Sequence, residues 1–154
     1  MAAACGVALL ALAACDTFPS RAKIGAVASP GSTLQLTWVN CRGEHVKRVE
    51  LRLTDKHHSK TLRVLWAVEA DVADPMVTRF TAGRTPDGYR EVVPLVGGLD
   101  GADPVTAVVT STRVDNEFLD FTVSELRADS VLVNRSPRHV TTPVFIHRAR
   151  KSCG

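Results

Sequence analysis

Several common signals of catalysis and metal binding are missing from this chain of 154 residues. It has no Gly-x-Ser-x-Gly motif, the strand-to-helix turn that presents the nucleophile of many hydrolases. It has no Cys-x₂-Cys pair of the kind that holds structural zinc, and its Gly97-Gly98 pair is not followed by the rest of a nucleotide-binding pattern. No segment of 11 or more residues carries a convincing helical period, which argues against a helical bundle.

The beginning of the chain is uncharged and rich in Ala and Leu up to Cys15, and Asp16 follows at once. Residues 6–14 supply the apolar stretch and the small-residue cleavage site of a secretory signal, and the run is too short for a membrane-spanning helix of about 20 residues. Its last four residues, Leu12-Ala13-Ala14-Cys15, resemble the lipobox of bacterial lipoproteins. A buried N-terminal helix is the alternative, but such a helix would show polar residues at helical period.

The lipobox resemblance implies a signal peptide over residues 1–14 and a Cys15 that carries acyl chains. Two or more chains give stable membrane anchoring where one chain is marginal, so the resemblance places the protein on the extracytoplasmic face of the cell membrane. No Lys or Arg precedes Cys15, whereas a signal peptide has a positive first segment. We therefore expect the true start to lie upstream of Met1.

Export also accounts for all four cysteines. Cys5 leaves with the signal and Cys15 becomes a thioether, so Cys41 and Cys153 remain as a pair in an oxidising compartment. We predict a disulfide between them that fastens the C-terminal end of the chain to the end of the first strand. Two unrelated thiols are the alternative, and neither cysteine has the neighbours of a zinc or copper site.

The part of the chain after Cys15 has room for one domain. Residues 15–32 mix Pro, Gly, Ser and Ala without a sustained period, which predicts a lipidated cysteine followed by a flexible tether. Residues 33–154 would then form the folded domain.

Alternating apolar and polar residues dominate this predicted domain. The clearest strands cover residues 34–39, 49–54, 62–69, 89–96, 105–112 and 119–123, and shorter ones are expected at 131–133 and 144–146. Seven to nine short strands separated by turn-forming clusters predict an all-β fold, a single β-sandwich of immunoglobulin-like or fibronectin-III-like type. A small barrel is the alternative.

Histidines and acidic residues supply the candidate reactive groups. His57 and His58 lie in a predicted turn beside lysines, where solvated side chains are expected rather than metal ligands. An acidic segment, Asp115, Asn116, Glu117 and Asp120, lacks the spacing of a calcium loop and predicts a turn between strands. We therefore expect no metal site, no cofactor and no catalytic residue.

Basic residues cluster near the C-terminus at His147-Arg148-Ala149-Arg150-Lys151. Such a cluster suits lipid headgroups or an anionic wall polymer, and a solvated tail is the plainer interpretation. Nucleic acid is not an expected partner of an exported domain.

These observations predict a membrane-anchored extracytoplasmic lipoprotein that serves as a non-catalytic binding or accessory module of the cell envelope, with an envelope protein or an anionic wall polymer as partner. Three alternatives stay open. One is an enzyme whose site is assembled from loop residues such as Asp115, Glu117, His139 and His147. The others are a metal-handling lipoprotein that uses its histidines and a purely structural envelope protein.

Overall fold

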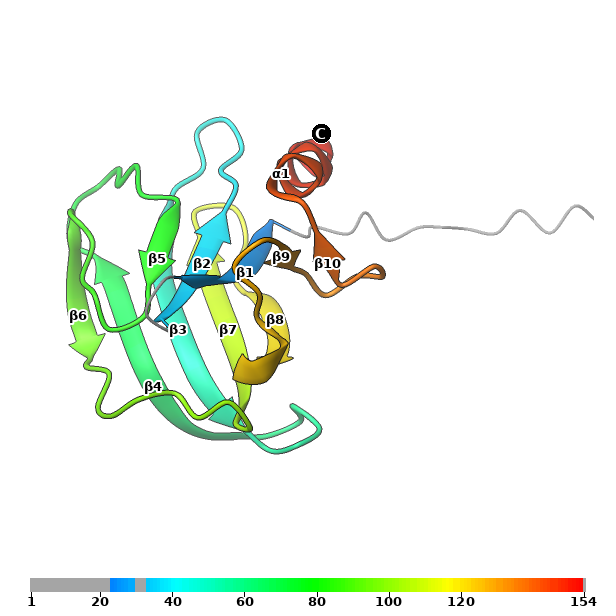
Figure 1. The fold of residues 1–154 in the computed structure, drawn as a ribbon. Coiled ribbons are helices and arrows are strands. Elements are labelled where there is room, and N and C mark those ends of the chain that lie inside the picture. Colours follow the sequence, from blue (N-terminus) through cyan, green and yellow to red (C-terminus); the bar gives the residue numbers. More distant parts are fainter. Residues whose placement is uncertain (1–22, 30–32, 154) are drawn as a thin grey trace, which may run out of the picture.

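The computed structural model describes residues 23–29 and 33–153. These residues form two five-stranded antiparallel sheets that pack together, with a single α-helix at one end (Figure 1). The predicted all-β sandwich is thereby confirmed. The described part of the chain holds ten strands rather than seven to nine, because two of them contain only two residues each.

The larger sheet has the strand order β6-β4-β3-β7-β8 and the smaller one the order β10-β9-β1-β2-β5. The larger sheet consists of β3 (Val46–Thr54), β4 (Thr61–Ala70), β6 (Tyr89–Val93), β7 (Pro104–Ser111) and β8 (Glu117–Thr122). The smaller sheet consists of β1 (Ile24–Ser29), β2 (Thr33–Trp38), β5 (Arg79–Thr81), β9 (Val131–Leu132) and β10 (His139–Val140). A short 3₁₀ helix, η1 (Val123–Glu125), follows β8, and α1 (Thr142–Lys151) follows β10.

The main core lies between the sheets and follows from the period-two pattern. On β2, Leu34, Leu36 and Trp38 are buried while the residues between them are only partly covered, as expected where one face of a strand meets a core. Neighbouring strands of both sheets add further large apolar side chains: Val49, Leu51, Trp66, Val68, Phe80, Val105, Val109, Leu119 and Phe121. This core fixes which side chains of the larger sheet face outward.

A second, smaller apolar cluster attaches α1 to the smaller sheet. It contains Phe145 and Ala149 from α1 and Val131, Val133 and Val140 from β9, β10 and the adjoining chain. The strand predicted at residues 144–146 is therefore wrong, because these residues lie in α1. The local preference of Val144 and Ile146 for strands is outweighed by the packing of Phe145 and Ala149, one helical turn apart, on the same apolar surface.

The tether predicted over residues 15–32 is also corrected, since residues 24–29 form β1 in the middle of the smaller sheet. β1 pairs with β2 from Ile24↔Trp38 to Ser29↔Thr33 and with β9 at Ala26↔Leu132. At Gly25 a Cβ would lie 2.3 Å from Cγ1 of Val131. Glycine is thus required there by the close approach of the second apolar cluster, and the folded domain includes β1, which begins nine residues before the predicted start at residue 33.

Within the described residues no helix has both the length and the apolar character needed to cross a membrane.

Candidate functional site

The predicted disulfide is present between Cys41 and Cys153, whose Cα atoms are 5.4 Å apart. Cys41 follows β2 and Cys153 follows α1, so the bridge joins the end of α1 to the loop between β2 and β3. Cys5, the lipobox and Cys15 lie outside the described residues.

A polar cleft lies on the outer face of the larger sheet, at the end where β3 turns into β4. Its volume is about 340 Å³. The strands place its base, because Thr106 of β7 pairs with both Arg52 of β3 and Asp120 of β8. The remaining walls come from the turn and from the strand ends around it: Thr54, His58, Ser59, Thr61 and Phe118. We call this group of residues the His58 cleft.

The β3–β4 turn brings His58 onto the sheet. The Asp55 carboxylate accepts hydrogen bonds from the backbone N–H groups of Ser59 and Lys60 and from the Ser59 hydroxyl. These bonds, led by the one from the Ser59 hydroxyl, hold the pKa of Asp55 below its ordinary value. They close a tight turn in which His58 takes a positive φ of 54°, a conformation uncommon for a residue with a side chain.

Two threonine hydroxyls lie within hydrogen-bond distance of the His58 ring. Its Nδ1 lies 3.0 Å from the Thr54 hydroxyl and 3.4 Å from the Thr106 hydroxyl. The Thr106 hydroxyl donates to Asp120 at 2.6 Å, and the Thr54 hydroxyl also lies 3.3 Å from the Pro104 carbonyl oxygen. A hydroxyl has one proton to donate, so the Thr54 proton goes either to the Pro104 carbonyl or to the His58 Nδ1.

The charges of the cleft are partly balanced. Arg52 forms an ion pair with Glu50 at 2.6 Å, and Asp120 lies 3.8 Å from the His58 Nδ1. Burial alone would raise the pKa of Glu50. Hydrogen bonds from Arg52 and Arg48 and the charges of both residues outweigh burial and hold this pKa below its ordinary value. Phe118 adds an apolar wall, since its side chain is 47 % exposed beside these polar groups.

At the other end of the larger sheet lies a buried cluster around Lys23. Lys23 and Glu44 are only 2 % and 1 % exposed, and the Lys23 ammonium contacts both Glu44 carboxylate oxygens at 2.6 and 2.7 Å. The ammonium also lies 4.7 Å from the Trp38 ring centre and 3.8 Å from Cys41 Sγ. Glu44 further accepts bonds from the Ser111 hydroxyl and the Cys41 N–H. This cluster joins the start of β1 to the disulfide.

Burial would raise the pKa of Glu44, but its hydrogen bonds from Lys23, Ser111 and Cys41 and the charge of Lys23 outweigh burial and lower it. Glu117 behaves differently. Its Oε1 accepts the backbone N–H groups of Lys23 and Ile24, while its buried Oε2 has no partner in the described part of the chain. Burial raises the pKa of Glu117 to about 7.

We expect this raised pKa to make the fold less stable as pH increases. Protonated Glu117 is favoured in the folded state, so its contribution is complete below about pH 4.5 and is lost as pH rises to about 7. The difference from the ordinary value of 4.5 corresponds to about 3 kcal/mol. Urea unfolding at pH 5 and pH 8 should show this loss in the native protein but not in Glu117→Gln. An equal pH dependence in both proteins would contradict the assignment.

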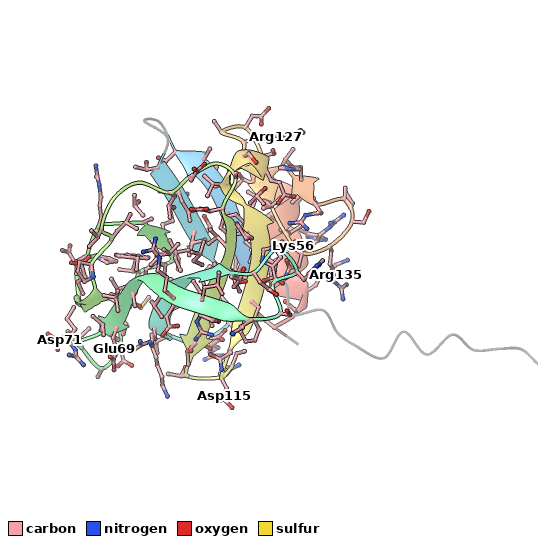
Figure 2. All side chains as sticks on the ribbon, turned by 90° about the horizontal axis from the view of Figure 1, so that it is seen from below. Lys56, Glu69, Asp71, Asp115, Arg127 and Arg135 are labelled. Atoms are coloured by element: carbon pink, nitrogen blue, oxygen red, sulfur yellow. A yellow bond between two sulfur atoms is a disulfide. The ribbon has the colours of Figure 1, made fainter. Side chains whose placement is uncertain are left out.

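The other residues named from the sequence do not form one site. Asp115 is exposed on the turn between β7 and β8, where Figure 2 shows it pointing outward. Asn116 accepts a bond from Thr110, whereas Glu117 faces Lys23 and Asp120 belongs to the His58 cleft. The side chains of the predicted acidic turn, residues 115–120, therefore contact different parts of the domain and do not form one cluster.

The histidines are also dispersed. His45 lies 3.3 Å from Asp74, and His139 lies 3.2 Å from the Ser130 hydroxyl. His57 and His147 are exposed. No group of three or more His, Cys, Asp or Glu side chains among residues 23–29 and 33–153 is placed to hold a metal ion.

Sequence reasoning named His58 only as a turn residue and did not single out Lys23 or Glu44. The residue types of Asp55-Lys-His-His-Ser-Lys60 predict the turn. They do not predict that His58 lies beside Thr106, because this contact depends on the register of β3 and β7.

Comparison of this chain with protein-family models, with curated proteins and with solved structures finds no match.

Proposed function

We propose that this protein is a membrane-anchored extracytoplasmic lipoprotein whose β-sandwich binds a polyhydroxylated ligand, such as a sugar unit of an envelope polymer, in the His58 cleft. The observation that carries the binding role is the cleft itself. It combines an exposed aromatic ring with several hydroxyls, a carboxylate and a guanidinium, and small-molecule sites typically combine an apolar wall with a few placed polar groups.

The extracytoplasmic location is supported by the lipobox resemblance at Leu12-Ala13-Ala14-Cys15 and by the disulfide between Cys41 and Cys153. Disulfides of this structural kind form and persist in oxidising compartments and are rare in the cytosol of most organisms. The anchor would be acyl chains on Cys15, and no cofactor is required.

A binding role is favoured over catalysis by the way the hydroxyls of the cleft are engaged. A serine or threonine nucleophile must give its proton to a neighbouring base. The Ser59 hydroxyl donates to Asp55, a weak base because its hydrogen bonds lower its pKa. Thr54 and Thr106 are only 3 % and 6 % exposed, so little of either side chain is open to a substrate.

The binding proposal predicts a ligand-dependent rise in melting temperature with soluble fragments of envelope polysaccharides. Phe118→Ala should weaken binding by about 10-fold, since burying an exposed Phe side chain under a ligand is worth about 1.5 kcal/mol at the lower end of the usual range. Asp120→Asn should also weaken it. Titration calorimetry provides the affinities.

Met76→Ala provides a matched control, because Met76 is another exposed apolar side chain and does not line the cleft. Equal affinities for Phe118→Ala and Met76→Ala would exclude the cleft as the binding site. Unchanged melting curves across the fragment panel would exclude this ligand class.

A further inference from the structure

We propose that the exposed basic face of α1 docks on an anionic lipid surface, namely the membrane that holds the Cys15 anchor. This inference rests on the proposed function for the anchor. It names the surface of the domain that meets the membrane, and it thereby determines the direction in which the His58 cleft faces.

The net positive charge of the chain comes from its last 24 residues, which include α1. From Val131 to the C-terminus there is no Asp or Glu, whereas five of the 19 Lys and Arg residues lie there. The preceding 130 residues carry the other 14 basic residues and all 16 acidic ones, a formal net charge of −2. The net charge of +3 therefore comes entirely from the segment that forms β9, β10 and α1.

Three of these five basic residues lie in the last turns of α1, away from its buried side chains. Phe145 and Ala149 are buried against the second apolar cluster, while Arg148, Arg150 and Lys151 are exposed. Val144, 41 % exposed, adds an apolar side chain one turn before Arg148. A helix that exposes basic side chains around an apolar one, here Val144, is suited to the interface of a bilayer with anionic headgroups. The predicted solvated tail is thus a packed helix whose basic side is open to solvent.

The position of the anchor brings this end of the domain close to the membrane. The carbonyl of Lys23 accepts a hydrogen bond from Val39, and the Lys23 ammonium lies 3.8 Å from Cys41 Sγ. Cys41 in turn is bonded to Cys153, two residues after α1. Eight residue steps separate Cys15 from Lys23, which even a fully extended chain covers in at most about 26 to 29 Å.

Electrostatic attraction then selects the orientation of the domain. The field of an anionic surface decays over about 8 to 10 Å at physiological salt, so only charges held near the surface contribute. In Figure 1 α1 lies at one end of the sandwich and the β3–β4 turn at the opposite end. Docking through α1 would therefore direct the His58 cleft away from the bilayer and toward polymers of the envelope.

Three exposed lysines allow the orientation of the domain on a membrane to be tested by chemical labelling. Lys151 lies on α1, whereas Lys56 and Lys60 lie in or beside the β3–β4 turn, and all three are exposed. Figure 2 shows Lys56 at the turn and Glu69 toward the other end of β4. The full chain, purified from bacterial membranes, is reconstituted into nanodiscs of phosphatidylcholine with or without 30 % phosphatidylglycerol. An amine-reactive reagent and mass spectrometry then measure the labelling rate of each lysine.

We expect Lys151 to be labelled about fivefold more slowly in anionic than in neutral discs, the change that corresponds to one Lys contact with an anionic surface. Lys56 and Lys60 should change by less than twofold. Arg148→Gln with Arg150→Gln keeps the Lys151 reporter and should abolish its protection. Arg63→Gln with Arg84→Gln removes two exposed charges elsewhere and should preserve the protection.

Equal labelling of Lys151 in both discs, or protection that survives loss of Arg148 and Arg150, would overturn the docking surface. Protection by a soluble polyanion but not by anionic discs would replace the lipid surface with a wall polymer and overturn the proposal as well. The intact mass tests the anchor separately. Protein without acyl mass whose Lys151 is still protected by anionic vesicles would overturn the anchor while supporting the docking surface.

Discussion

Loss of the Cys41–Cys153 disulfide should lower the free energy of unfolding by about 4 to 5 kcal/mol. The two cysteines are 112 residues apart in sequence, and closing a loop of about 100 residues removes about 4.7 kcal/mol of chain entropy from the unfolded state. Guanidinium unfolding with and without a reducing agent should measure this loss. The buried Trp38 and Trp66 provide the fluorescence signal.

The structure also predicts where the reduced protein loosens first. α1 is held by a small apolar cluster and by the bridge next to its end, so its amide hydrogens should exchange before those of β3 and β7. Cys41→Ala with Cys153→Ala should reproduce the effect without a reducing agent. An unchanged unfolding midpoint in both cases would mean that the bridge contributes nothing to stability.

Glu44→Gln should lower the free energy of unfolding by about 3 to 5 kcal/mol. Removing one partner of a buried ion pair leaves the other charge uncompensated, and here the Lys23 ammonium is 2 % exposed. Its remaining neighbours, the Trp38 ring and Cys41 Sγ, do not replace a carboxylate. Urea unfolding at pH 6 provides the measurement.

Two comparisons separate the charge from the shape of Glu44. Adding Lys23→Met to Glu44→Gln should recover most of the lost stability, because the unpaired ammonium is then absent. Glu69→Gln removes a carboxylate that pairs with Arg48 and Arg90 at the surface and should cost less than about 1 kcal/mol. If Glu44→Gln and Glu69→Gln lower the free energy of unfolding by similar amounts, the buried ion pair contributes no more to stability than a surface pair.

The strands that the sequence predicts most clearly are those in which one face meets the main core. β2, β3, β4, β7 and β8 each show large apolar residues at alternate positions, and burial of these residues determines both the strand and its orientation. The number of cysteines, together with the expected oxidising compartment, predicted the disulfide between Cys41 and Cys153. Neither inference needed the strand order or the register of the sheets.

β1 and α1 were missed because the residues that they pack against at the second apolar cluster lie far away in sequence, although β1 pairs with the neighbouring strand β2. β1 is built from small residues, and Gly25 is favoured there only because Val131 and Phe145 come close to it. α1 has ten residues, too few for a clear helical period, and β-branched residues near its start. Its usable signals were Pro143 in the first turn and basic residues in the last turn.

The candidate site could be predicted only in part. The turn before β4 was visible from its residue types, and Asp120 was noted as an acidic residue. The contact of His58 with Thr106 and Asp120 requires the register of β3, β7 and β8. The buried pair of Lys23 and Glu44 required the position of β1, which the sequence pattern assigned to a tether.

The path of the chain through the disulfide has a mechanical consequence. Cys41 and Cys153 close a covalent ring that contains every element from β3 to α1, while β1 and β2 lie outside it. A pulling force applied between residue 23 and the C-terminal end can therefore extend only these two strands and the residues up to Cys41. Beyond that point the load passes into the ring, whose ends cannot separate while the sulfur–sulfur bond is intact. The part of the domain between the two cysteines is therefore not stretched by this force, even if its apolar core unfolds.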